Sequence, residues 1–363
     1  MKHFKCLLKI NNGIRYKYML LLYLLFTFIF LIVRYPSIAA DGVKYGLSLC
    51  FQSLIPSLYP FLIVVELLLS TGILMKNNKL LDFLSLKIFR LPFSLNIFIL
   101  SCLGGYPIGV TCVSNLVGRG VLNAEEGEKL LNFTVNPSLS FAVAFVGAML
   151  YKSIKAGFVL YLSVILSSII VGILFGRKIK INRYTRVMDA LEENETDFST
   201  AFTLSVKKSA VTMFYICSFT VLFSSICSLV EILPFLPEIN LLIKSITEVT
   251  NGISLAYKAR SLPFIASLMS FGGLSVAFQI FSVQGELKIK SIKYFFVRTV
   301  SAVLCYLVST VMLKIFPVTV NTFSPSGGSC GVLTSHSTSA SIGMILMTVI
   351  FIVDDSITAI KNT

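Results

Sequence analysis

The sequence predicts an all-α polytopic integral membrane protein with two weakly similar repeats that contain broken or re-entrant helices. Of its 363 residues, 55% are hydrophobic and only 13% are charged, whereas an ordinary soluble domain has about 25% charged residues. The mean hydropathy is +0.85. The apolar residues fall into long stretches, and glycine-rich interruptions occur inside some of them.

Nine or ten apolar stretches can be distinguished. Most are long enough to cross a bilayer, since about 20 helical residues span about 30 Å of hydrocarbon. They run from about Met19 to Val33, Leu47 to Leu74, Phe93 to Val117, Leu130 to Leu150, Ala156 to Phe175, Ala210 to Leu233, Ile239 to Tyr257, Leu262 to Val283, Tyr294 to Phe316 and Ala340 to Val353.

Charge and cysteine usage exclude several other classes. The net charge of +14 comes from short basic clusters between apolar stretches, which is typical of topology signals in a lipid bilayer and not of a nucleic-acid surface. The eight cysteines lie mostly in apolar stretches without CxxC spacing, and His3 and His336 are the only histidines. We therefore expect no metal, no cofactor and no enzyme of the soluble type.

The chain is predicted to have the following organisation. Residues 1–42 form a basic amino terminus and a first span, 43–176 a first membrane repeat, 177–205 a charged cytoplasmic linker, 206–316 a second repeat, and 317–363 a loop and a last span. A removed signal peptide is the alternative for the first span, because Ser37 to Ala40 resembles a cleavage site. We favour a retained span, since Arg34 and Pro36 intervene.

The halves also show weak internal similarity. Phe98 to Ser101 resembles Phe264 to Ser267, and Gly118 to Leu122 resembles Val283 to Leu287 at nearly the same interval. Duplication explains this order, although chance alignment of apolar sequence is the alternative.

Glycines interrupt apolar stretches in both halves. Non-helical backbone at membrane depth lines a cavity or is buried in protein, because hydrocarbon cannot satisfy free N–H and C=O groups. The parity of the basic loops indicates that the stretches at 93–117 and 262–283 are re-entrant hairpins. Charge places both on one membrane face, whereas an inverted repeat would place them on opposite faces. The interruptions are Gly104, Gly105, Tyr106 and Pro107 in the first half and Gly272 and Gly273 in the second.

Two carboxylates lie in apolar surroundings. Glu66 follows Phe61 to Val65 and precedes three leucines, and a charge there costs about 2.5–3.5 kcal/mol on insertion scales unless it faces a polar interior. The alternative is that Pro56 and Pro60 break the helix and lift Glu66 to the interface. Glu248 is followed by Asn251 and Gly252. Two interpretations of Glu248 are equally open: it belongs to a solute site, or it forms a structural ion pair with Lys244, one turn earlier.

A further polar cluster contains Asn132, Asn136 and Pro137. Asn136 is predicted to end a helical piece because proline disfavours helix at the preceding residue. Both amides can recognise a carboxylate or a heteroaromatic ring, or they can simply satisfy backbone groups freed by Pro137. Upstream, Asn123 is predicted to be a helix N-cap with Glu125 and Glu126 in the first turn.

Several of these segments together resemble the nucleoside-recognition or Gate-domain membrane proteins, including members that act in sporulation. The similarity extends from about Val43 to Leu313, and two departures concern the substrate: the family's Asn-Thr-Ser-Asn-Pro run and its lysine after Gly-Tyr-Pro are not matched here. The segments are Leu54 to Phe61, the Glu66 segment, Gly104 to Gly109 and Asn132 to Pro137.

The resemblance implies a transporter that carries dipicolinic acid, a small aromatic dicarboxylate, across the outer forespore membrane of a spore-forming bacterium. In that case Tyr106 packs on the ring, helix N-termini and the two amides bind the anion, and Glu66 is a candidate proton site. No buried cation is expected, because Lys207, Lys208 and Arg298 lie near segment ends and are predicted to snorkel. The protein could also form a homo-oligomer, and the sequence leaves this question open. The alternatives are a membrane scaffold or assembly factor for spore envelope or cortex maturation, and a transporter of a different nucleoside-like solute.

Overall fold

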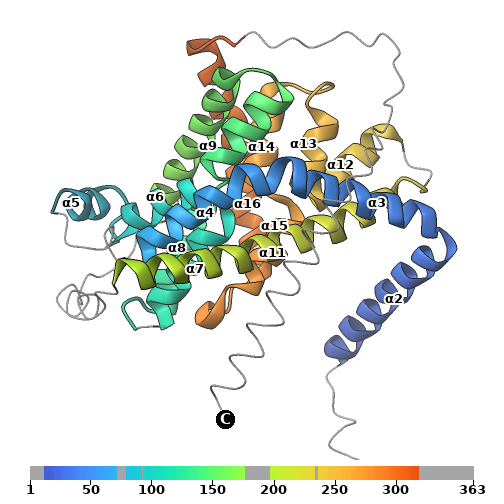
Figure 1. Cartoon of the computed structure of the whole chain (residues 1–363), viewed down its shortest axis with the longest axis horizontal. Helices are drawn as coiled ribbons and strands as arrows, with labels where there is room; N and C mark the ends of the chain where they lie inside the picture. Colours follow the sequence, from blue (N-terminus) through green and yellow to red (C-terminus); the bar gives the residue numbers. More distant parts are fainter. Residues whose placement is uncertain are drawn as a thin grey trace, which may run out of the picture.

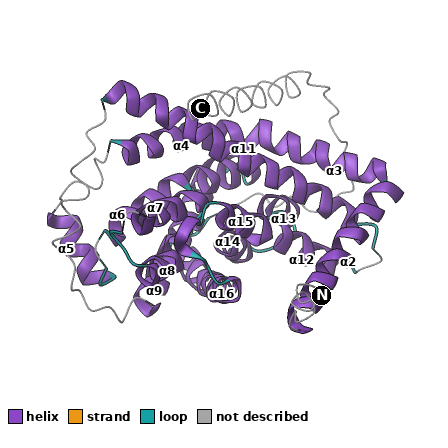
Figure 2. Ribbon diagram, turned by 90° about the horizontal axis from the view of Figure 1, so that it is seen from below, coloured by secondary structure: helices purple, strands orange, loops and turns teal. Residues whose placement is uncertain are grey.

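The computed structural model describes residues 12–71, 79–91, 93–118, 120–175, 197–233 and 236–318, and all regular secondary structure in these ranges is helical (Figure 2). Five helical segments in them are long and apolar enough to cross a membrane: Pro36–Ser70, Ile154–Phe175, Phe198–Val230, Leu262–Ser282 and Ser291–Ile315. The predicted all-α polytopic membrane fold is confirmed. The last predicted span, residues 1–11 and most of the 177–205 linker lie outside the described residues.

The outer surface of the helices is apolar, as lipid contact requires. On α9 (Ile154–Phe175), the large side chains of Ile154, Phe158 and Leu162 are exposed at intervals of one helical turn. The opposite face of the same helix buries Ser163 and Ser167. Apolar residues therefore point outward and polar residues point toward the protein interior, where other chain segments can satisfy them.

Apart from α5 in the first half and η4 in the second, each half has the same order of elements: a long helix, a pair of short helices, an interrupted helix and a second long helix. The first half contains α3 (Pro36–Leu49), η1 (Cys50–Leu54), α4 (Ile55–Ser70), α5 (Lys79–Ile88), α6 (Ser94–Gly104), α7 (Tyr106–Gly118), α8 (Ala124–Thr134), η3 (Phe141–Leu150) and α9. The second contains α11 (Phe198–Val230), α12 (Pro237–Thr247), α13 (Val249–Ala256), α14 (Leu262–Phe271), α15 (Gly273–Ser282), η4 (Gly285–Leu287) and α16 (Ser291–Ile315). Ahead of both halves, α2 (Asn12–Arg34) projects from the helical body (Figure 1).

The short helices of each pair fold back on one another as hairpins. A Cβ added at Gly109 of α7 would lie 2.9 Å from the Cβ of Ser101 in α6, although eight residues of continuous helix would span about 12 Å. Likewise, a Cβ at Gly252 of α13 would lie 2.5 Å from the Cα of Ser245 in α12. The fold-back predicted within 93–117 is present; that it re-enters one membrane face stays a prediction.

The second predicted hairpin is wrong in its position. Residues 262–282 form one apolar segment that is interrupted at Gly272 and Gly273, both with a positive φ (83° and 79°), and the fold-back occurs one element earlier, in α12 and α13. The charge argument failed because basic residues flank the ends of several elements on both faces. The matched segments at 98–101 and 264–267 therefore lie in non-equivalent elements, one in a hairpin and one in an interrupted helix.

The corresponding long helices of the two halves run antiparallel. Along α3, α4 and α11, Gly42 lies against Ser225, whereas Ser70 at the other end of the pair accepts a hydrogen bond from Ser205. Along α9 and α16, Lys155 donates to the carbonyl of Pro317, just beyond the end of α16. The two halves are thus inverted relative to one another.

The long helices enclose the hairpins and the interrupted helices. Figure 2 shows α3, α4 and α11 along one edge and α9 and α16 along the opposite edge, with the shorter helices between them. This layering places the interruptions in the interior of the protein, away from lipid.

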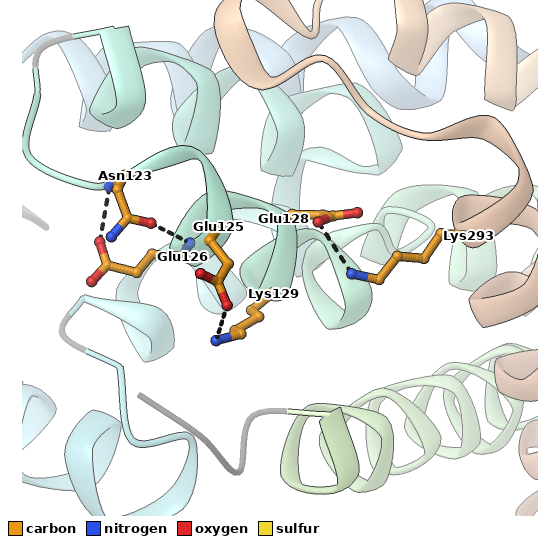
Figure 3. Close-up of polar contacts among 6 residues, drawn as sticks. All are labelled: Asn123, Glu125, Glu126, Glu128, Lys129 and Lys293. Atoms are coloured by element: carbon orange, nitrogen blue, oxygen red, sulfur yellow. Dashed lines mark hydrogen bonds and ion pairs between the residues drawn. The ribbon is translucent and has the colours of Figure 1, made fainter. Parts of the chain in front are cut away.

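The predicted N-cap of α8 is also confirmed. The side chain of Asn123 accepts from the Glu126 backbone N–H at 2.8 Å, and the Glu126 carboxylate accepts from the Asn123 N–H at 2.8 Å (Figure 3). This reciprocal capping box satisfies donors that have no partner within the helix.

We predict that Gly109→Ala destabilises the protein by about 2–3 kcal/mol, because the new methyl group overlaps the Thr134 carbonyl oxygen and Ser101 and overpacking has costs of this size. Thermal unfolding in detergent, followed by helical circular dichroism, measures the effect. The matched control is Gly118→Ala on the same helix, where nothing lies within 4 Å of the added Cβ. Equal melting temperatures for the two variants would contradict the hairpin packing.

Candidate functional site

A central cavity lies where the chain interruptions of both halves meet. Its volume is about 40 Å³, and it is lined by Leu54, Leu58, Gly104, Gly105, Tyr106, Pro107, Ser138, Phe141, Ile216, Thr220, Glu248, Val249, Thr250, Val276 and Gln279. Both hairpin tips contribute, as do the segment between α8 and η3 and helix α15. The structure therefore brings together the first glycine-rich interruption and Glu248, which the sequence predicted separately.

Each hairpin tip packs against the interrupted helix of its own half. A Cβ at Gly105 would lie 3.3 Å from the Ser138 side chain, and a Cβ at Gly273 would lie 2.9 Å from the Ile246 carbonyl oxygen. Both glycines have a positive φ, which only glycine adopts at low cost. These close approaches hold each hairpin tip against an interrupted helix.

The cavity is small. A volume of about 40 Å³ holds a few water molecules, since each needs roughly 10–15 Å³ by the same measure. Pockets for organic ligands usually have about 300–1,000 Å³. The cavity in this structure therefore has no room for an organic solute of several atoms.

Glu248 is the carboxylate that lines this cavity. It forms the N-cap of α13, accepting from the Asn251 N–H at 2.6 Å and from Thr250, and it is only 1% exposed. The predicted alternative of a Lys244–Glu248 ion pair is wrong, because α12 ends at Thr247 and Lys244 pairs with Glu231 instead. The positive end of α13 compensates the carboxylate.

Tyr106 connects the two halves. Its ring lines the central cavity, and its hydroxyl donates to the Met269 carbonyl of α14 at 2.6 Å. Gly272 lies beside the same ring, because a Cβ there would be 3.6 Å from Cε1 of Tyr106. The residue thus offers an aromatic face to the cavity while it holds the end of an interrupted helix.

Arg298 is the functional candidate that sequence reasoning missed. Instead of snorkelling, it is 2% exposed and is among the largest fully buried side chains of the described residues. Its position only four residues into a predicted apolar stretch suggested a segment end, but α16 begins earlier, at Ser291. The rule that marks an ionisable residue in an apolar stretch as a candidate site would have found Arg298 as it found Glu66.

The Arg298 guanidinium caps two interrupted helices, one from each half. It donates to the carbonyls of Asn132 and Val135 at the end of α8 and to the Ser270 carbonyl at the end of α14. The last carbonyls of a helix have no intrahelical donor and carry partial negative charge. One cation therefore satisfies both ends.

The two asparagines of the first half have different surroundings. The Asn136 amide donates to the Phe133 carbonyl at 2.8 Å and accepts from the Ser168 hydroxyl, so it satisfies backbone freed at Pro137, as the structural alternative predicted. Asn132 lines a second, smaller pocket beside Arg298. Neither amide lines the central cavity. Asn251 lies behind Glu248, where its side chain donates to Ser224 at 2.7 Å.

Glu66 faces the protein interior, away from the central cavity. Helix α4 continues through Pro60 and Glu66 is 4% exposed, so the alternative of a helix broken at proline is wrong. Within the described part of the chain, the carboxylate accepts no hydrogen bond, and Lys208 on the neighbouring α11 supplies an attractive charge. Glu66 remains a candidate proton site but not a residue of the cavity.

Comparison with known proteins gives one relevant similarity. The chain is 26% identical to the sporulation integral membrane protein YlbJ of Bacillus subtilis (strain 168), and the match covers 75% of this chain and 77% of that protein. No family model matches, so the Gate-domain resemblance remains a prediction. No solved structure matches either. The long apolar helices of this chain identify it as an integral membrane protein.

We predict that Arg298→Gln destabilises the protein strongly, because each buried carbonyl left without a donor costs about 1–3 kcal/mol. Thermal unfolding in detergent provides the measurement. Lys314→Gln removes the same charge from the exposed end of α16 and is expected to change stability by less than about 1 kcal/mol. The capping role would be excluded if the two variants unfolded at the same temperature.

Proposed function

We propose that this protein is a membrane transporter whose solute passes through the central cavity when the two hairpins separate. The observation that carries the proposal is the convergence of chain interruptions from two inverted halves on one cavity. Inverted repeats with discontinuous helices at a shared midplane site are the arrangement of many secondary transporters. In an inverted pair, one hairpin can open the path toward one membrane face and the other hairpin toward the opposite face.

The proposed solute is a small aromatic dicarboxylate, with dipicolinic acid as the first candidate, and the proposed setting is the outer forespore membrane during sporulation. The support is the similarity to a sporulation integral membrane protein together with the chemistry of the cavity. Tyr106 supplies an aromatic face, Thr250 and Gln279 supply hydrogen-bond donors, and Arg298 lies immediately behind Tyr106. The Glu248 charge is already compensated by α13, which reduces its repulsion of an anion.

In this proposal the protein acts without catalysis and without a cofactor, and its partners are the anion and the lipid bilayer. A scaffold is the second candidate function, and the small cavity together with glycine contacts between helices favours it. Gly147 and Gly157, for example, bring η3 and α9 into backbone contact, as small residues do in static membrane helix packing. Movement of solute distinguishes the two functions.

We predict that proteoliposomes with this protein accumulate labelled dipicolinate faster than empty liposomes, and that Thr220→Met slows this uptake at least tenfold. Thr220 on α11 lines the cavity, and the longer side chain fills a space of about 40 Å³. Thr203→Met, at an exposed position on the same helix, is the control and is expected to transport normally.

The outcomes separate the alternatives. Wild-type uptake equal to that of empty liposomes would favour the scaffold and end the transporter proposal. Normal uptake by Thr220→Met, with wild-type uptake present, would show that solute takes another path.

A further inference from the structure

A second pocket lies between α8 and α16, beside the central cavity. Its volume is about 10 Å³, enough for about one water molecule. Several of its lining residues have charged or polar side chains. The lining consists of Glu128, Leu131, Asn132, Ile289, Lys293, Tyr294, Val297 and Arg298.

The Tyr294 hydroxyl has no acceptor in this pocket. The residue is 8% exposed, and among the described residues its buried hydroxyl has no hydrogen-bond partner. Buried polar groups are nearly always satisfied, and exceptions often mark a place for water, an ion or a ligand. The hydroxyl is therefore available to an acceptor that enters the pocket.

The Arg298 charge is likewise not neutralised by a carboxylate. Its hydrogen bonds within the described residues go to backbone carbonyls and to the Ser301 hydroxyl, and these groups carry only partial charge. Removal of a cation from water is costly unless an opposite charge is near. Capping of the helices explains why Arg298 is buried, but it leaves the full positive charge beside a pocket with a free hydroxyl donor.

Residues that line the second pocket and the central cavity meet at the last turn of α14. Tyr106, which lines the cavity, donates to the Met269 carbonyl, and Arg298, which lines the second pocket, donates to the next carbonyl, that of Ser270. The side chains of Tyr106 and Tyr294 are close enough to Arg298 to interact with it electrostatically. Tyr106 and Arg298 thus link the two spaces through neighbouring carbonyls of α14.

A charged pair lies at the outer end of the second pocket. Lys293 of α16 contacts Glu128 of α8 at 3.1 Å (Figure 3), and their side chains are 46% and 24% exposed. Because α16 runs antiparallel to α9, this end lies on the face where α9 ends. The basic segment Arg177 to Arg186 follows α9 in the sequence, so the positive-inside rule assigns this face to the cytoplasm.

We infer that the second pocket is an anion-binding station on the cytoplasmic half of the transport path, an inference that rests on the proposed function. A carboxylate that passes Tyr106 meets the Arg298 guanidinium, the free Tyr294 hydroxyl and the Asn132 side chain. The Glu128–Lys293 pair controls access from the cytoplasmic face, since Lys293 attracts an approaching anion and Glu128 repels it.

The test uses two substitutions that break the same ion pair and change the charge in opposite directions. Glu128→Gln removes the repelling charge and is expected to lower the half-saturation concentration for dipicolinate about three- to tenfold, whereas Lys293→Gln is expected to raise it by a similar factor, as expected for one partly exposed charge. The difference in half-saturation concentration between the two variants is expected to become smaller at high salt, because salt screens exposed charges. A merely structural pair predicts changes of the same sign in both variants and would overturn the inference.

Tyr294→Phe provides an independent arm. The hydroxyl makes no hydrogen bond within the described residues, so the variant is expected to melt like the wild type while its half-saturation concentration rises about fivefold. Uptake is measured in proteoliposomes with labelled dipicolinate, and folding is checked by thermal unfolding. Unchanged uptake by Tyr294→Phe, with the two charge variants also unchanged, overturns the inference while the transport function stands. A wild-type protein that moves no dipicolinate overturns the function, and the inference with it.

Discussion

The structure depends on one constraint: a helix that ends inside a membrane protein must find hydrogen-bond partners within the protein, because lipid offers none. This chain meets the constraint with side chains from other elements. Tyr161 of α9 donates to the Cys102 carbonyl at the end of α6, Tyr106 donates to α14, and Arg298 donates to both α8 and α14. The ends of the interrupted helices are therefore tied to neighbours and not free to fray.

These ties also determine how the protein can move. Tyr106 belongs to the first half and its acceptor to the second, and Arg298 joins interrupted helices of both halves. Separation of the hairpin tips around the central cavity must exchange such hydrogen bonds for contacts with water or solute. Because a buried unsatisfied carbonyl costs about 1–3 kcal/mol, partly opened states are unfavourable unless a solute or water replaces the lost donor. A solute that supplies its own polar groups lowers this cost, which couples opening to binding.

The sequence predicted the class of fold, the first hairpin and the capping box of α8, since these follow from local patterns: apolar length, glycine and proline at a break, and an Asn-x-x-Glu spacing. It did not predict the break at Glu248. No glycine or proline marks that position, and the residue was read as one turn of a continuous helix after Lys244. Arg298 was missed for a related reason. Its burial depends on carbonyls more than a hundred and sixty residues away in sequence, and such partners become visible only when the halves are assembled.

The two ionisable groups at the centre lie against helix ends and not against each other. Glu248 lies at the positive end of α13, and Arg298 lies at the negative ends of α8 and α14, with Tyr106 between the cavity and the arginine. Had the two formed a direct ion pair, each charge would be cancelled by the other and the interior would offer little to a charged solute. The partial charges of the helix ends stabilise Glu248 and Arg298 where they lie. Because these partial charges do not cancel a full charge, much of the electric field of each group still reaches the neighbouring pocket. If the protein transports a dicarboxylate as proposed, a carboxylate beside one cavity and a guanidinium beside the next give the path an asymmetry, and that asymmetry follows from how the broken helices are capped.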